Sequence, residues 1–227
     1  MKKSIYIQRL DRIQSEIWAK LLKPIGFKKR GRSFNRKTAD DLIQVIEFQL
    51  GQAYLNDNDK FSVYIGIRVP ESFEKTFVET EQIKSFYQYQ YCNIVTCLND
   101  RTLGHSAYKA SNGTSYNAKM FMLDMEDLRP TIEEIEEMFE THVFPFLDDM
   151  NTREKVLANR LKYHVKYKMF ELSNTIDLDE AMIYGRAGNL EKAKQIIQQR
   201  YDNSVTHKPH QEYLISLSKE LGIMLET

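Results

Sequence analysis

The side chains most able to do chemistry are the five histidines, but their spacing assembles no recognised site. Only His207 and His210 lie close together in the sequence, and a proline precedes the second of them. A protein metal site needs three or four convergent ligands, and no cysteine or further histidine lies near this pair. We interpret the pair as the solvated start of a helix, and His142 and His164 as packed residues at helix edges.

The two cysteines, Cys92 and Cys97, form no metal or disulfide motif. They lie five residues apart in an apolar run that reads as a strand, and this spacing directs their side chains to opposite faces. A mutual disulfide is therefore not expected. Two buried free thiols are typical of a reducing compartment, and we predict neither a metal nor a cofactor.

The sequence motifs of known enzymes are missing. Gly31 stands without the further glycines of a GxGxxG or GxxxxGK phosphate loop, and no HExxH or GxSxG sequence occurs. We therefore favour a protein that is not an enzyme. A hydrolase or transferase with an unrecognised site stays an alternative.

Glu47 is the only carboxylate within a predicted apolar strand, residues 42–49. If this strand pairs with the next one, residues 61–69, Glu47 would lie near Arg68 on the face opposite the main core. A cross-strand ion pair is the interpretation that we favour. A catalytic carboxylate would need a cleft and a perturbed pKa, and the sequence indicates neither.

Charge is distributed unevenly, although the 227 residues carry a net charge of zero. Residues 1–40 contain twelve Lys or Arg against three Asp or Glu, and residues 120–150 contain ten Asp or Glu against Arg129 alone. Two candidate contact surfaces follow: a basic turn with Lys28, Lys29, Arg30 and Arg32, and an acidic helix with Glu133, Glu134 and Glu137. A basic turn suits an acidic protein or nucleic-acid phosphate. Solvated surface charge is the simpler interpretation, which we favour for the basic turn.

A run of alternating tyrosines is the third candidate contact surface. Tyr87, Tyr89 and Tyr91 would line one face if their segment is a strand. Tyrosine is favoured at protein interfaces because its ring is apolar and its hydroxyl is polar. A sheet face covered by helices from the C-terminal part is the competing interpretation, and the more favoured one.

The elements that would position these residues form an α+β fold. Apolar spacing predicts a helix over 4–23, followed by strands over 32–36, 42–49 and 61–69 that form an antiparallel meander. Further strands are predicted over 93–98 and 118–123. Residues 79–91 favour a short helix followed by a strand, and residues 104–117 read as a surface loop.

The chain is predicted to be helical from Pro130 onward. Thr131 and Glu134 have the spacing of a capping box, and Pro145 is expected to end or kink the first of these helices. Later helices are expected over 152–172, from 177 to 188, over 190–201 and over 209–222. The pair at 179–201 is similar to one tetratricopeptide unit, without a second copy.

We therefore place a sheet domain at 1–128 and a helical region packed against it at 129–227. No apolar run approaches the about 18 residues of a membrane span, and charged residues interrupt the N-terminal apolar stretch, so we predict a cytoplasmic protein.

The segment from Leu22 to Arg36 (LKPIGFKKRGRSFNR), with Glu47-Phe48-Gln49 after it, resembles a bacterial family known only as a domain of unknown function. The resemblance covers about the first 130 residues and leaves the C-terminal third uncovered. It implies a bacterial cytoplasmic α+β domain and brings no catalytic residues.

Together these features predict a bacterial protein-binding module, with immunity or antitoxin proteins as the class that the resemblance suggests. The expected partner is another protein, and no membrane is expected. The alternative is a nucleic-acid-binding protein that uses the basic turn at 28–32.

Overall fold

A computed structural model describes residues 4–51, 59–70, 86–99, 102–104, 120–159, 176–204 and 206–226. The chain forms two compact units, the first with Met1–Pro70 and Val78–Phe170, the second with Glu71–Phe77 and Glu171–Thr227. The boundary therefore does not fall at the predicted residue 128. The helical elements at 129–149 follow this position, yet they pack on the sheet and belong to its unit.

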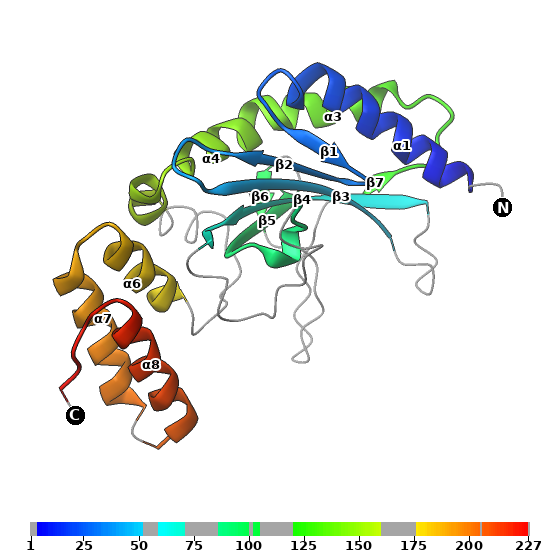
Figure 1. Ribbon diagram of the computed structural model, residues 1–227. Helices are drawn as coiled ribbons and strands as arrows, with labels where there is room; N and C mark the ends of the chain where they lie inside the picture. Colours follow the sequence, from blue (N-terminus) through cyan, green and yellow to red (C-terminus); the bar gives the residue numbers. More distant parts are fainter. Residues whose placement is uncertain are drawn as a thin grey trace. The chain divides into compact units, whose positions relative to one another are not determined.

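The first unit is built on an antiparallel sheet, as the predicted meander requires (Figure 1). Its strands are β1 (Lys28–Arg30), β2 (Ser33–Lys37), β3 (Ile43–Leu50), β4 (Lys60–Arg68), β5 (Ile94–Asn99), β6 (Thr102–Gly104) and β7 (Phe121–Met122). The first six follow one another in space in chain order, and β7 pairs with the start of β4. The α+β class predicted from the sequence is confirmed.

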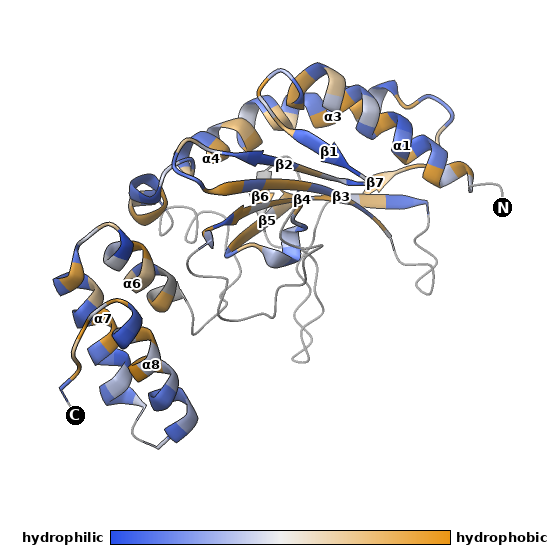
Figure 2. Ribbon diagram, viewed as in Figure 1, coloured by the Kyte–Doolittle hydropathy of each residue, from blue (hydrophilic) through white to orange (hydrophobic). Residues whose placement is uncertain are grey.

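One face of the sheet carries the main core, and we call it the helix face. Alternate residues of β4 from Phe61 to Ile67 are fully buried there, as their alternation predicts. The rings of Phe34, Phe48 and Phe61 continue this core from strand to strand, with centroids 5.6 and 5.9 Å apart. Figure 2 shows the hydrophobic residues along the sheet and on the helices above it.

The N-terminal helix α1 (Ile5–Ile17) lies on the helix face (Figure 1). Ser4 caps it, since its hydroxyl accepts the N–H of Ile7, and its apolar stripe is buried. A π-helical turn, η1 (Trp18–Leu22), continues it, and Gly26 with φ of 90° lets the chain reverse into β1. The predicted helix over 4–23 is confirmed.

Three further helical elements cover the same face: α3 (Arg129–Met138), the π-helical turn η5 (Phe139–Val143) and α4 (Phe144–Asp149). The predicted capping box is wrong, because α3 begins two residues before Thr131 and has Pro130 in its first turn. Pro145 does not end the helical run, since it falls in the first turn of α4 after the π-helical turn. Residues 153–159 are also helical.

The second unit contains α6 (Ile176–Arg186), α7 (Leu190–Asn203) and α8 (Lys208–Glu220). Gly188, with φ of 82°, and the cap at Asn189 form the predicted turn between α6 and α7. The three helices share a core around Ala181, Ala193 and Leu217. In the part of the chain that the structure describes, no helix is long and apolar enough to span a membrane.

Candidate functional site

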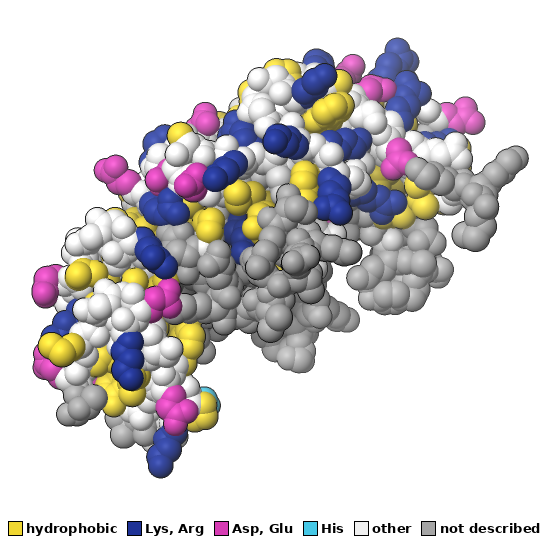
Figure 3. Space-filling model, viewed as in Figure 1, with side chains coloured by type: hydrophobic (Ala, Val, Ile, Leu, Met, Phe, Trp, Pro, Cys, Tyr) yellow, Lys and Arg dark blue, Asp and Glu magenta, His cyan; other side chains and the backbone are white. Residues whose placement is uncertain are grey.

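The basic turn is the hairpin of β1 and β2, at one edge of the sheet. Gly31, with φ of 61°, forms its tip, and Lys28 and Arg30 are exposed. Lys28 and Arg30 alternate with Lys29 along β1, so they point to the face opposite the helices. Lysine on an edge strand also discourages pairing with other chains. Figure 3 shows Lys and Arg side chains over the region of α1, β1 and β2.

Lys29 does not share that exposed surface. Its side chain lies on the helix face, with Nζ 5.6 Å from the ring centre of Phe34 and 3.4 Å from the Ser15 hydroxyl. Burial lowers the pKa of Lys29, and the nearby charge of Asp11 opposes this shift. The four predicted basic residues are therefore divided between two faces, with Arg32 half-buried beside the tip.

The acidic helix presents an exposed stripe on α3 and η5. Glu133, Glu137 and Glu140 are exposed at spacings of four and three, while Glu134 is half-buried. The opposite side of this helical run carries Ile135 and Phe139, which are fully buried. Two of the three predicted acidic contacts, Glu133 and Glu137, therefore share one solvent-exposed stripe.

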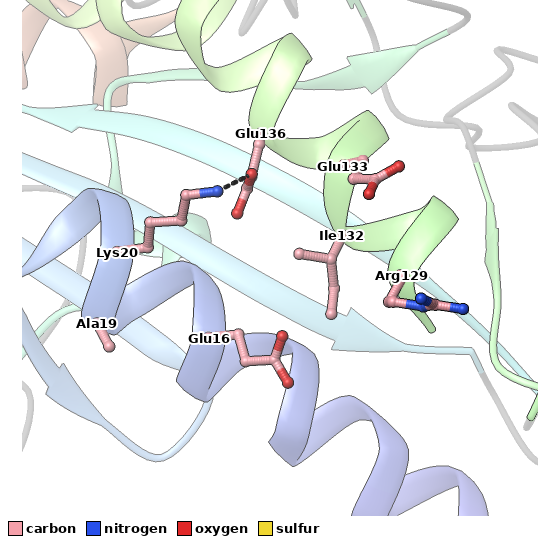
Figure 4. A pocket seen from close by; sticks show the side chains of 7 residues that line it. All are labelled: Glu16, Ala19, Lys20, Arg129, Ile132, Glu133 and Glu136. Atoms are coloured by element: carbon pink, nitrogen blue, oxygen red, sulfur yellow. Dashed lines mark hydrogen bonds and ion pairs between the residues drawn. The ribbon is translucent and has the colours of Figure 1, made fainter. Parts of the chain in front are cut away.

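A shallow groove of about 560 Å³ runs between α1 and α3 (Figure 4), lined by Glu16, Ala19, Lys20, Arg129, Ile132, Glu133 and Glu136. Its charges are largely paired. Lys20 donates to Glu136 across the groove, and Arg12 lies 2.9 Å from Glu16. Arg129 binds Asp127 and holds the pKa of that carboxyl at about 2. The groove is thus a charge-matched seam between two helices.

The tyrosine run is not a strand, contrary to the prediction. Its last three residues form the 3-10 helix η4 (Tyr89–Tyr91), and Gln88 before it is extended. The tyrosine segment, residues 87–91, lies across the sheet face opposite the helices. Residues 79–85 of the predicted helix, and the predicted loop 104–117 beyond Gly104, lie outside the described residues.

Polar side chains of the sheet hold the backbone of the tyrosine segment. The Asn35 side chain accepts the Tyr87 N–H at 2.6 Å and donates to the Tyr87 carbonyl at 2.8 Å. Glu47 accepts the Tyr89 N–H at 3.1 Å, and Arg68 donates to the Tyr91 carbonyl at 3.1 Å. The segment is fixed by side chains of β2, β3 and β4 where a strand would use backbone pairs.

The rings of Tyr87 and Tyr89 contact residues of β4, and the Tyr89 hydroxyl reaches β3. The Tyr87 ring lies over the Arg68 guanidinium at 4.3 Å, and the Tyr89 ring stacks on Tyr64 with centroids 4.1 Å apart. The Tyr89 hydroxyl donates to Gln49 at 3.2 Å. Arg68 was predicted to face away from the core, but the segment covers it and leaves 1% of its surface exposed.

Glu47 and Arg68 share a face, as predicted, but they are not cross-strand neighbours. The register places Glu47 opposite Tyr64, and Arg68 opposite Ile43. Burial raises the pKa of Glu47, while the Tyr89 N–H, the Ser33 hydroxyl and the charge of Arg32 oppose this shift. Both charged residues bind the tyrosine segment, a role that sequence reasoning missed. The sequence signal for this role was the alternation of polar residues along β2, β3 and β4.

The cysteines also lie differently from the prediction. Cys97 is opposite Tyr64 in the sheet, and Cys92 packs against Gly66 of β4, so both lie on the face opposite the helices. The prediction failed because β5 begins only at Ile94. Neither cysteine forms a disulfide, and burial raises the pKa of the Cys92 thiol and that of the Cys97 thiol, the latter to about 12. Such thiols are poor nucleophiles at neutral pH.

His207 caps α8, because its Nδ1 accepts the N–H of His210. This agrees with the interpretation of the pair as a helix start. Among the described residues, no group of three or more His, Cys, Asp or Glu side chains could hold a metal ion.

Comparison with known proteins gives a match to a protein-family model. Neither curated proteins nor solved structures show a match to this chain. A family model matches residues 18–149, which is more than half of the chain and runs from η1 to the end of α4. The chain therefore belongs to the family described as Domain of unknown function (DUF4304).

Proposed function

We propose that this protein is a non-enzymatic protein-binding module that uses the acidic stripe of Glu133, Glu137 and Glu140 as a contact surface. The observation that supports the proposal is the exposure of these three carboxylates on one side of a helical run whose other side is buried. The fold requires the buried side, and the exposed side is available for recognition.

The stripe also carries a cost, which Lys20 and Arg129 offset in part because their charges attract Glu133 and Glu140. Like charges four residues apart on a helix destabilise it by about 0.2–0.5 kcal/mol per pair. A negative surface attracts a basic partner and accelerates their encounter. We propose a bacterial cytoplasmic protein of the immunity or antitoxin type, whose acidic stripe masks a basic, nuclease-type toxin.

The test is affinity capture from the source organism's lysate, followed by binding measurements with the purified captured protein. The variant Glu133→Gln/Glu137→Gln/Glu140→Gln should bind at least about tenfold more weakly, a loss of about 1.4 kcal/mol. The matched control Glu191→Gln/Asp202→Asn/Glu212→Gln removes the same charge from exposed residues of α7 and α8. Equal binding by the wild-type chain and the stripe variant would refute the contact surface.

A second candidate function is nucleic-acid binding, which the exposed Lys28 and Arg30 of the hairpin favour. Such binding should weaken steeply as salt rises, because phosphate contacts release counterions. A gel-shift series with DNA and RNA from 50 to 200 mM salt tests it, with Lys28→Glu/Arg30→Glu as the variant. No shift at low salt would eliminate this candidate.

A further inference from the structure

The sheet face opposite the helices recognises the backbone of the tyrosine segment. Asn35 binds both the N–H and the carbonyl of one residue, Tyr87, and Glu47 and Arg68 bind one backbone group each. Backbone N–H and carbonyl groups are present in every peptide. The polar contacts of this face would therefore fit another segment of the same conformation.

The two positions that hold the rings of Tyr87 and Tyr89 add a side-chain requirement to this backbone recognition. Arg68 lies under the ring of Tyr87, and Tyr64 lies under the ring of Tyr89, two residues later. The intervening Gln88 is exposed, and so is Gln90. The face thus favours aromatic side chains at two positions separated by one residue, and it places no requirement on the exposed side chain between them.

The segment is anchored at its C-terminal end by the residues that follow it. Cys92 packs so closely on β4 that a Cβ atom added to Gly66 would lie 2.5 Å from its sulfur. Asn93 follows, its N–H bound to the carbonyl of Ile67 and its side chain accepting the N–H of Val69. Residues 87–91 could leave the face while Cys92 and β5 stay in place.

We propose that this sheet face is a binding surface for a short aromatic-x-aromatic segment of a partner protein, and that residues 87–91 occupy it in the free chain. The partner segment displaces the chain's own segment and makes the same contacts to Asn35, Tyr64 and Arg68. The inference rests on the proposed function in one respect, namely that the partner is a protein. It does not involve the acidic stripe.

Because residues 87–91 already occupy the face, they determine how tightly a free peptide can bind it. A tethered segment competes at an effective concentration in the millimolar range, so a free peptide binds the wild-type chain only weakly. The apparent affinity increases in proportion to the fraction of molecules whose face is free. Weakening the tethered segment should therefore strengthen binding of a free peptide.

The experiment measures fluorescence anisotropy with the labelled peptide Phe-Tyr-Gln-Tyr-Gln-Tyr, the sequence of residues 86–91, and the full-length chain. The variant Tyr87→Ala/Tyr89→Ala removes both rings from the tethered segment and leaves the face intact. It should bind the peptide at least about tenfold more tightly than the wild-type chain does. Gln88→Ala/Gln90→Ala is the matched control, because it truncates two exposed side chains of the same segment, and it should bind like the wild-type chain.

Adding Asn35→Ala to the tyrosine variant should abolish peptide binding, since the two-point contact to the backbone is lost. The milder Tyr89→Phe removes only the hydroxyl that donates to Gln49, and it should raise peptide affinity severalfold if the double variant proves unfolded by circular dichroism. The inference is overturned if neither tyrosine variant, when folded, binds more tightly than the wild-type chain. It is also overturned if Asn35→Ala leaves binding unchanged, because the peptide then binds elsewhere.

Discussion

Replacing Glu47 by glutamine tests whether this residue matters as a charge or as a hydrogen-bond acceptor. The Glu47 carboxylate is 9% exposed and accepts the backbone N–H of Tyr89. Glutamine has nearly the same shape and keeps an oxygen in place for this bond. Leucine, the comparison variant, removes the acceptor and leaves the Tyr89 N–H without its partner.

The expected magnitudes differ between the two variants. Glu47→Leu should lower the free energy of unfolding by about 1–3 kcal/mol, the cost of an unsatisfied buried polar group. In a chain of this length that is a fall in Tm of about 2–12 °C. Glu47→Gln should cost less than about 1 kcal/mol at neutral pH, because the loss of a charge-assisted bond is offset by relief from burying the charge.

The pH dependence gives the more specific result. Burial raises the pKa of Glu47 above its usual 4.5, so between pH 4.5 and the folded pKa the folded chain binds more protons than the unfolded chain does. The free energy of unfolding therefore decreases as pH rises through this window, and the favourable contribution is fully present below pH 4.5. Glutamine does not titrate, so the stability of Glu47→Gln relative to the wild-type chain should increase across the window and then level off.

Urea unfolding monitored by tryptophan fluorescence, at intervals from pH 4.5 to 8, would measure these differences. The chain has one tryptophan, Trp18, whose indole N–H donates to the carbonyl of Phe27 in the first unit. The fluorescence signal therefore reports the unit that contains Glu47. The reasoning fails if the glutamine variant is as unstable as the leucine variant at pH 7, or if its difference from the wild-type chain is constant with pH.

Three further substitutions probe packing and capping. Gly66→Ala places a Cβ atom 2.5 Å from the Cys92 sulfur, so it should cost about 1–3 kcal/mol by overpacking, measured by urea unfolding with Trp18 fluorescence. An unchanged urea midpoint would contradict this, because it would show that Cys92 can move away from the added Cβ atom without a loss of stability. Phe48→Ala removes a fully buried ring between two others and should cost about 3–5 kcal/mol in the same assay. Asn189→Ala removes the side chain that accepts the N–H of Lys192 at the start of α7, and should cost the second unit about 0.5–2 kcal/mol. Circular dichroism should detect that loss while Trp18 fluorescence does not.

The sequence predicted the sheet because local patterns determined it. The alternation from Phe61 to Ile67 required one buried face. The short strand β1, which forms a hairpin with β2 around Gly31, was not predicted. Helix α1 followed from apolar residues at helical spacing. Each of these signals lies within a few residues, where periodicity and turn chemistry act.

The opposite face of the sheet was not predicted, because its cover is not regular secondary structure. Alternation correctly identified Arg68 as pointing away from the main core. It did not predict that the side chain is buried on that other face. A face that meets solvent and a face covered by an irregular segment carry the same polar residues. The difference lies in partners 23 to 52 positions away in the sequence, such as Asn35 for Tyr87 and Arg68 for Tyr91, and periodicity does not report them.

The extent of the family match indicates which surfaces belong to the shared domain. Residues 18–149 include the basic hairpin, the tyrosine segment with its partners on β2 to β4, and the acidic stripe. They exclude α6, α7 and α8, which have a core of their own. A function that depends on the sheet or on α3 therefore uses the part of this chain that matches the family, whereas one that depends on α6–α8 would use the part outside the match. The proposed stripe and the proposed peptide-binding face both fall within the matched region, so the variants proposed for them test surfaces of the family domain and not of α6–α8.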